Sequence, residues 1–224
     1  MTVYNIPEEN IFPRPELADE DGLLGIGGDL SPERLINAYA NGIFPWYSDD
    51  QPILWWSPDP RLVLFPKDFK RNKSLRRIVE QGRFDVRFDN DFEAVIRNCA
   101  IIKRDDQDSS WITEKMITAY INLFELGYAH SVETYFNGDL VGGLYGVSLG
   151  KAFFGESMFH KKTDASKVAL WHLVDKLLEW EFDIIDTQQE TNHLKSLGAI
   201  TIKREKFLNL LEIAVRKKGE IGKW

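Results

Sequence analysis

The sequence is poor in cysteine and in long apolar runs. Cys99 is the single cysteine among 224 residues, so the chain cannot form an internal disulfide, as is usual in the reducing cytoplasm. It lies in the apolar-patterned stretch 92–100, where we expect a buried small side chain. No stretch approaches 18 consecutive apolar residues, so we expect no membrane-spanning helix. The first 22 residues are acidic and lack the basic start and apolar core of a signal peptide, and a cytoplasmic protein is expected.

Motifs for metal and nucleotide chemistry are also missing. Four histidines occur, none with metal-ligand spacing or a cysteine companion, so no metal is expected: His130, His160, His172 and His193. The glycines of 25–28 do not form GxGxxG, and the chain has neither a GxSxG elbow nor a Walker loop. A dinucleotide fold, a serine-hydrolase nucleophile and a phosphate-binding loop are therefore not predicted.

Positive charge is scarce except in one short stretch. The net charge of −7 argues against a surface covered in positive charge that would bind long nucleic acids. A local basic patch remains compatible with it, because salt screens electrostatic fields over about 10 Å. Six basic residues fall within eleven positions: Lys67, Lys70, Arg71, Lys73, Arg76 and Arg77. This basic stretch is either an ordinary solvated loop and helix face or a surface for phosphates.

The first sixty residues differ in composition from the rest. They hold eight of the nine prolines and three of the seven tryptophans, so they cannot be regular helix or sheet throughout. One helix is predicted there, with Ser31 as N-cap, Pro32 at the first helical position and an end near Gly42.

Regular patterns follow from about residue 61. Helices are predicted at 74–80, 91–100, 113–126, 164–180 and 204–217, and strands at 130–136, 140–149, 151–159 and 182–188, with a hairpin turn at Asn137-Gly138. This order predicts an α+β fold. We divide it into a small Pro/Trp-rich N-terminal domain, 1–62, and a C-terminal domain, 63–224.

Sequence blocks along most of the chain resemble one known family. GGDLS (27–31), GIFPW (42–46) and WWSPDPR (55–61) have the order and spacing of the leucyl/phenylalanyl-tRNA–protein transferase family, and similar blocks follow as HSVE (130–133), FGESMF (154–159), DTQ (186–188) and HLKSLGA (193–199). The resemblance implies a C-terminal domain like the GNAT acyltransferases. It also implies transfer of leucine or phenylalanine, with methionine as a further candidate, from aminoacyl-tRNA to proteins that begin with arginine or lysine, which marks them for degradation under the N-end rule. Because an aminoacyl ester is already activated, no cofactor is expected.

Family precedent points to Asp186 and Gln188 as the catalytic pair, with Glu156 third. Positions i and i+2 of a strand share a face, so both side chains of the pair could reach one site. Gln188 would accept a hydrogen bond from the attacking amine, and Asp186 would hold or polarise it. Without the resemblance, the pair could equally satisfy a loop, and Glu156 would be an ordinary strand carboxylate.

The resemblance also assigns substrate-binding residues. Five match an apolar pocket for the aminoacyl side chain: Leu144, Phe153, Met158, Leu170 and Leu173. Relatives tend to have larger groups at 144 and 173, which leaves the preference between leucine and phenylalanine open. Trp46 and Trp111 match aromatic positions that could stack on the terminal adenosine or flank the aminoacyl group. The basic stretch would meet acceptor-stem phosphates.

Three other functions fit parts of the pattern. An acetyltransferase would cradle the pyrophosphate of acetyl-CoA with a glycine-rich turn, but the connection 160–166, HKKTDAS, contains no glycine. A tRNA-binding module would need none of the catalytic residues. An aminoacyltransferase for cell-wall precursors would differ in its acceptor.

Overall fold

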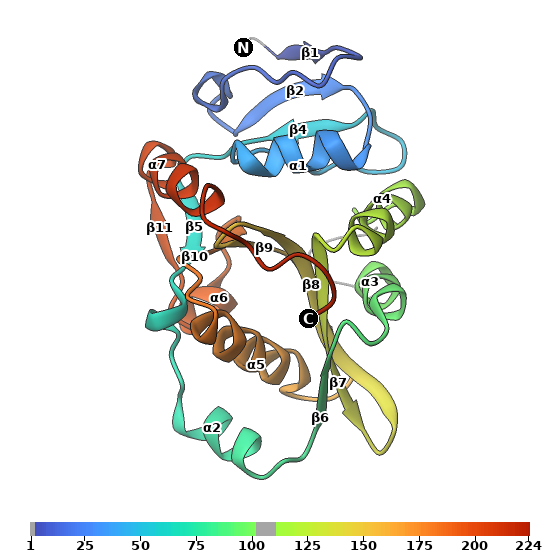
Figure 1. Cartoon of the computed structure of the whole chain (residues 1–224), viewed down its shortest axis with the longest axis vertical. Coiled ribbons are helices and arrows are strands. Elements are labelled where there is room, and N and C mark those ends of the chain that lie inside the picture. The colour runs from blue at the N-terminus through green and yellow to red at the C-terminus, as the bar shows by residue number, and fades with distance from the viewer. Residues whose placement is uncertain (1–2, 102–110) are drawn as a thin grey trace.

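The computed structural model describes residues 3–101 and 111–224, which form two sheets (Figure 1). The smaller sheet has the order β1-β2-β4-β3 and comes from the Pro/Trp-rich segment. Its strands are β1 (Tyr4–Ile6), β2 (Leu23–Gly27), β3 (Phe44–Pro45) and β4 (Leu54–Trp56), with a 3-10 turn at Pro15–Leu17. Helix α1 (Pro32–Ala40) joins β2 to β3 and also contacts α4, α7 and β8 of the larger part.

The larger sheet has seven strands in the order β11-β5-β10-β9-β8-β7-β6. They are β5 (Arg61–Leu64), β6 (Asp85–Phe88), β7 (Ala129–Phe136), β8 (Asp139–Leu149), β9 (Ala152–His160), β10 (Ile184–Gln188) and β11 (Ile200–Ile202). Neighbours are antiparallel except β9 and β10, which are parallel and joined by helix α5 (Ala165–Glu179). Three antiparallel strands, a crossover helix and a parallel strand follow one another in the order that the sequence predicted.

Helices cover both faces of this sheet. Helix α5, with α2 (Lys73–Glu80) and the short α6 (Asn192–Ser196), buries apolar side chains on one face. On the other face, α3 (Phe92–Ile101), α4 (Glu114–Glu125) and α7 (Arg204–Val215) share a core with α1 and the small sheet. Within 3–101 and 111–224, no helix combines the length and the apolar character needed to cross a membrane.

The predicted α+β fold is confirmed, and every predicted helix and strand is present with ends shifted by one or two residues. Cys99 is buried, as predicted. Ser31 does occupy the N-cap of α1, but its hydroxyl makes no capping bond; its backbone N–H instead donates to Asp29 Oδ1 at 2.8 Å. Seven short strands, β1 to β6 and β11, were not predicted, because an alternating pattern cannot be recognised over so few positions.

The centre of the sheet requires a glycine at position 146. Gly146 of β8 lies opposite Gly155 of β9, next to a register shift in the ladder. A Cβ atom at Gly146 would lie 2.2 Å from the Phe154 carbonyl oxygen and 2.6 Å from the Phe153 ring. At Gly155 the nearest atom to such a Cβ is 3.7 Å away. The Phe153 ring can therefore cross β8 only because residue 146 has no side chain.

This pair of glycines gives a matched test of packing. Gly146→Ala is expected to lower the free energy of unfolding by about 1–3 kcal/mol, because backbone and ring must both move. Gly155→Ala should change it by less than about 1 kcal/mol. Urea unfolding of both variants checks this, and equal stability of the two would contradict the close approach described.

Candidate active site

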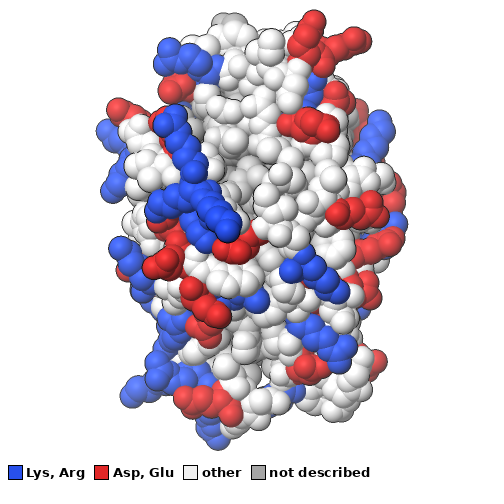
Figure 2. Space-filling model, in the orientation of Figure 1, with Lys and Arg blue, Asp and Glu red and all other residues white. Residues whose placement is uncertain are grey.

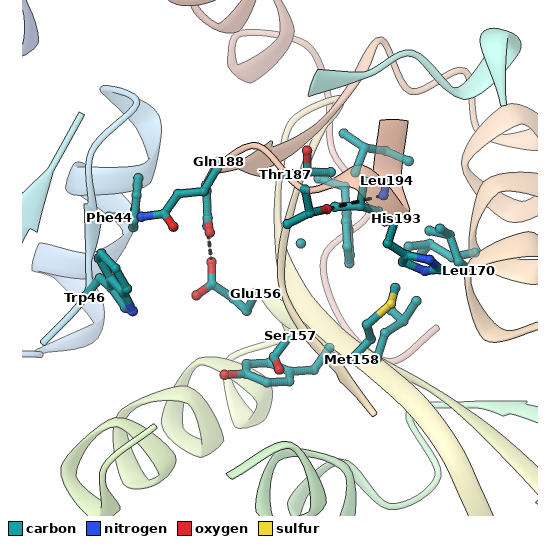
Figure 3. Close-up of a pocket in the computed structure, with 18 of the residues that line it drawn as sticks. Phe44, Trp46, Glu156, Ser157, Met158, Leu170, Thr187, Gln188, His193 and Leu194 are labelled. Atoms are coloured by element: carbon teal, nitrogen blue, oxygen red, sulfur yellow. Dashed lines mark hydrogen bonds between the residues drawn. The ribbon is translucent and has the colours of Figure 1, made fainter. Parts of the chain in front are cut away.

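A cavity of about 340 Å³ lies where β9 and β10 separate. The two strands pair only as far as Phe154 and Asp186, and the residues that follow on each strand line the cavity. Figure 3 shows Phe44 and Trp46 on one side of Gln188 and Leu170, Met158 and His193 on the other. The site thus combines residues of both sheets with residues of α5 and the β10–α6 connection.

The residues predicted for substrate binding all line this cavity: Trp46, Trp111, Leu144, Phe153, Met158, Leu170 and Leu173. Phe153 and Leu173 form part of its apolar floor and are fully buried, whereas Trp46 and Trp111 are half-buried. Phe44, Ile185 and Leu194 extend the apolar wall and were not predicted. The apolar patterns around these residues resemble those of any core strand or helix, so nothing in the sequence marked them as cavity residues.

Gln188 and Glu156 meet at the polar wall of the cavity. The Gln188 Nε2 group donates to Glu156 Oε1 at 2.7 Å (Figure 3). Tyr120 of α4 donates to the other carboxylate oxygen, Glu156 Oε2, at 3.0 Å. The Tyr120 hydroxyl is in turn hydrogen-bonded to that of Tyr39 from α1. A buried polar network therefore connects the cavity to two helices distant in sequence, and neither tyrosine was predicted.

Glu156 has a strongly raised pKa. Burial raises the pKa of its carboxyl from 4.5 to about 7, and the nearby Asp186 adds to the increase, although hydrogen bonds from Tyr39, Tyr120 and Gln188 act against it. Burial and the adjacent Glu156 raise the pKa of both tyrosines well above 10, so their hydroxyls remain protonated. Glu156 therefore changes its charge near neutral pH, as functional carboxyls often do.

Asp186 occupies a different position from the one expected. It is fully buried, does not line the cavity, and forms a two-pronged ion pair with Arg61, to Nε at 2.9 Å and to Nη2 at 2.7 Å. The expectation that residues 186 and 188 share a face is wrong, because a bulge interrupts β10 between them and Gln188 adopts φ +61°. As a result, Thr187 and Gln188 both border the cavity.

Asp186 nevertheless contacts Gln188 through the backbone. Its Oδ1 atom accepts a hydrogen bond from the Gln188 N–H at 3.0 Å. Arg61 lies between the rings of Phe44 and Phe207, 4.8 and 4.6 Å from their centroids, so the carboxylate is held by a group that cannot easily move. The left-handed conformation of Gln188 is unusual for a residue with a side chain. The hydrogen bond from its backbone N–H to the Asp186 carboxylate stabilises it.

His193 lines the open side of the cavity. Partial burial lowers the pKa of its imidazole, and the nearby Lys167 and His160 lower it further. The ring is therefore neutral at neutral pH. Its position after the DTQ block was the only signal in the sequence that it could reach the site.

The basic stretch lies outside the cavity, on the far side of α5. Most of its side chains are exposed, but Arg71 is half-buried on the rings of Phe69 and Trp171 and pairs with Asp175 of α5. Helix α2 packs on α5, and Figure 2 shows Lys and Arg side chains over α2, at the lower left. A phosphate-binding surface here would therefore be separated from the cavity by α5, the helix whose residue Leu170 lines the cavity.

Metal-binding geometry is absent from the described ranges 3–101 and 111–224. No three His, Cys, Asp or Glu side chains there are grouped so that they could hold an ion. The site has one apolar half and one polar wall that offers an amide and a carboxyl. It suits a substrate with an apolar side chain beside a group that donates a hydrogen bond.

Comparison with known proteins agrees with this geometry. Residues 63–212 match the family described as leucyl/phenylalanyl-tRNA protein transferase, and residues 28–59 match its N-terminal domain. The chain is 59% identical over 211 residues to the leucyl/phenylalanyl-tRNA–protein transferase of Syntrophobacter fumaroxidans, covering 94% of this chain and 90% of the relative. It is 52% identical over 224 residues to that of Solidesulfovibrio magneticus, covering 100% and 91%.

Among solved structures, a GCN5-related N-acetyltransferase-like protein from Streptococcus suis is similar with a TM-score of 0.39 and 13% identity, covering 74% of this chain and 61% of that one. The family models and the full-length relatives are far more specific than this. The chain therefore belongs to the leucyl/phenylalanyl-tRNA–protein transferase family.

Proposed function

We propose that this protein transfers leucine or phenylalanine from aminoacyl-tRNA to the α-amino group of proteins that begin with arginine or lysine, and so marks them for degradation. The observation that carries the proposal is the Gln188 amide, held by Glu156 at the border of an apolar cavity. At about 340 Å³ the cavity lies at the small end of ligand sites, which span about 300–1,000 Å³. It suits one apolar side chain with its ester.

The reaction is the aminolysis of an ester. A bond forms between the acceptor nitrogen and the aminoacyl carbonyl carbon, the bond from that carbon to the ribose oxygen breaks, and one proton passes from the nitrogen to the leaving oxygen. An α-amino group has a pKa of roughly 8, so part of the acceptor is unprotonated at neutral pH. The protein's main contribution is then to position the amine and to guide its proton.

Gln188 would orient the attacking amine. Because its Nε2 group donates to Glu156, its carbonyl oxygen remains to accept an N–H of the amine. This orientation depends on an ionised Glu156, since a carboxylate only accepts hydrogen bonds, whereas a protonated carboxyl can donate to the amide oxygen. The negative charge of Glu156 would also stabilise the positive charge that develops on the nitrogen.

Asp186 would act as a positioning residue. It contacts Arg61 and the Gln188 backbone and is sealed from the cavity, so its contribution is to hold the bulge that turns Gln188 toward the substrate. A direct contact with the amine would require the ion pair to break. Removal of one partner of a buried ion pair costs about 3–5 kcal/mol.

Trp46 and Trp111 would receive the terminal adenosine. Both are half-buried at the cavity, and Trp46 is fixed by an edge contact with Trp56, whose indole N–H donates to the Trp46 carbonyl oxygen at 2.7 Å. Stacking on a base is worth about 1–3 kcal/mol and needs no sequence readout. An aminoacyl-tRNA substrate also implies a cytoplasmic reaction, in line with the sequence prediction.

The division into two domains, 1–62 and 63–224, remains part of the proposal. Strands up to Trp56 build the small sheet, and strands from Arg61 onward build the large one. The small domain would then contribute Phe44 and Trp46 to a site whose remaining parts belong to the larger domain.

The function is tested with radiolabelled leucyl-tRNA, purified protein and peptides that differ only in their first residue. Label is expected on peptides that begin with arginine or lysine, and Gln188→Ala should lower kcat/KM by about 10²-fold because the amine loses its orientation. Transfer to no peptide at all would contradict the proposal and favour a tRNA-binding module. Transfer to a cell-wall peptide alone would identify a different acceptor.

The raised pKa of Glu156 predicts a pH-dependent rate. Because the pKa of this carboxyl is about 7, the orienting charge is largely lost at pH 6 and present at pH 8. The ratio of kcat/KM between the protein and its Glu156→Gln variant should therefore rise about tenfold over this range. The acceptor amine titrates identically in both, so it cancels from the ratio; a constant ratio would exclude ionised Glu156 from this role.

The basic stretch is tested by salt dependence. Neutralising Arg76 and Arg77, both exposed on α2, should weaken tRNA binding and reduce the slope of log K against log salt by about one unit per lost phosphate contact. Arg14, exposed in the small domain, provides a control with the same change of charge for each single substitution. If affinity and slope stay the same in the α2 variants, this surface does not meet tRNA.

A further inference from the structure

Trp224 packs against the residues behind the cavity floor. The segment after α7 runs past the β8–β9 turn, where Gly219 approaches Gly150, and ends near β8 (Figure 1). There the Trp224 indole stacks on His130 of β7, with ring centroids 3.8 Å apart and planes at 11°. The backbone N–H of Trp224 donates to Asp89 Oδ2 at 2.8 Å, and the same oxygen lies 2.8 Å from His130 Nδ1. This places the indole against the buried face of the sheet.

Phe153 lies between Trp224 and the cavity. Its ring centroid is 5.8 Å from that of Trp224, and the same fully buried ring lines the cavity. The ring also crosses Gly146 at a distance that leaves no room for a Cβ atom, so β8 blocks movement toward the sheet. The space behind Phe153 is therefore filled by Trp224.

The segment that carries Trp224 is held at several points. Lys217 forms an ion pair with Asp183 at 2.7 Å, and Glu220 forms one with Lys151 at 3.1 Å. The Gly222 N–H donates to the Gly127 carbonyl oxygen at 3.1 Å. Trp180 also contacts the indole edge-on, with centroids 5.2 Å apart. The position of the indole is thus set by contacts independent of Phe153.

From these contacts we infer that Trp224 is a positioning residue that sets the depth of the aminoacyl cavity by supporting Phe153. The inference rests on the proposed function and concerns the choice between leucine and phenylalanine. With the indole in place, Phe153 closes the floor. Without it, the ring can move back into the vacated space, which deepens the cavity and favours the longer phenylalanyl side chain.

The test measures binding of two stable probes, 3′-amino-3′-deoxyadenosine linked through an amide to leucine or to phenylalanine. For Trp224→Ala, the ratio of the phenylalanyl to the leucyl association constant should rise about tenfold over that of the unaltered protein, the scale at which apolar pockets separate neighbouring side chains. Trp224→Phe, which keeps a ring behind Phe153, should give a ratio close to the original. Because incomplete folding lowers both constants equally, the ratio isolates the effect on cavity depth.

Two variants separate this effect from general destabilisation. Phe84→Leu removes a ring from the same core, where Phe84 contacts Phe136 but does not line the cavity, and should leave the ratio unchanged. Phe153→Leu deepens the floor directly and should raise it. If Trp224→Ala fails to fold, Trp224→Leu removes less volume and should give a smaller rise.

An unchanged ratio in the Trp224 variants, together with a raised ratio in Phe153→Leu, would overturn the inference but leave the proposed function intact. Failure of the unaltered protein to bind either probe would overturn the proposed function and the inference with it. A rise in the Phe84→Leu control equal to that in Trp224→Ala would also overturn the inference, because any loss of core packing would then suffice.

Discussion

The buried ion pair between Arg61 and Asp186 is the interaction on which the active site depends. It joins β5 to β10, and through the rings that enclose Arg61 it also joins the small sheet, which supplies Phe44, to α7, which supplies Phe207. Two charges can be removed from water at such a point only when they are paired closely and in good geometry. The pair meets this condition with two hydrogen bonds below 3 Å. The same carboxylate then holds the backbone of Gln188.

The bulge at 186–188 links this ion pair to the cavity. A regular strand would send residues 186 and 188 to the same face and residue 187 to the other. The bulge breaks this alternation, so that Asp186 stays in the core beside Arg61 while Gln188 reaches the cavity. The strained backbone of Gln188 is maintained because the surrounding core determines it. Asp186 therefore stabilises the backbone from within the core, while the Gln188 amide borders the cavity.

The second carboxyl, Glu156, depends on elements far from it in the sequence. Tyr120 of α4 donates a hydrogen bond to Glu156, and Tyr39 of α1 is hydrogen-bonded to Tyr120. Without these hydroxyls, burial would raise the pKa of the Glu156 carboxyl still further. The small domain therefore contributes to the electrostatics of the cavity as well as to its wall. On the opposite side, the segment after α7 fills the layer behind Phe153. The cavity is thus shaped by both ends of the described chain.

Sequence reasoning determined the α+β class, the helices and long strands, the family and seven of the apolar and aromatic side chains that line the cavity. These follow from periodicity over many residues and from distinctive blocks such as WWSPDPR and DTQ, which depend only on local order. It failed for the short strands β1 to β6 and β11 and for the orientation of Asp186, because a bulge and the pairing of short strands are decided by neighbours that are distant in the chain. The partnership of Arg61 with Asp186, the tyrosines on Glu156 and the place of Trp224 were decided only by tertiary structure. Burial changes the pKa of a carboxyl, the strength of an ion pair and the mobility of a ring. These side chains become buried only when segments that are distant in the chain pack together.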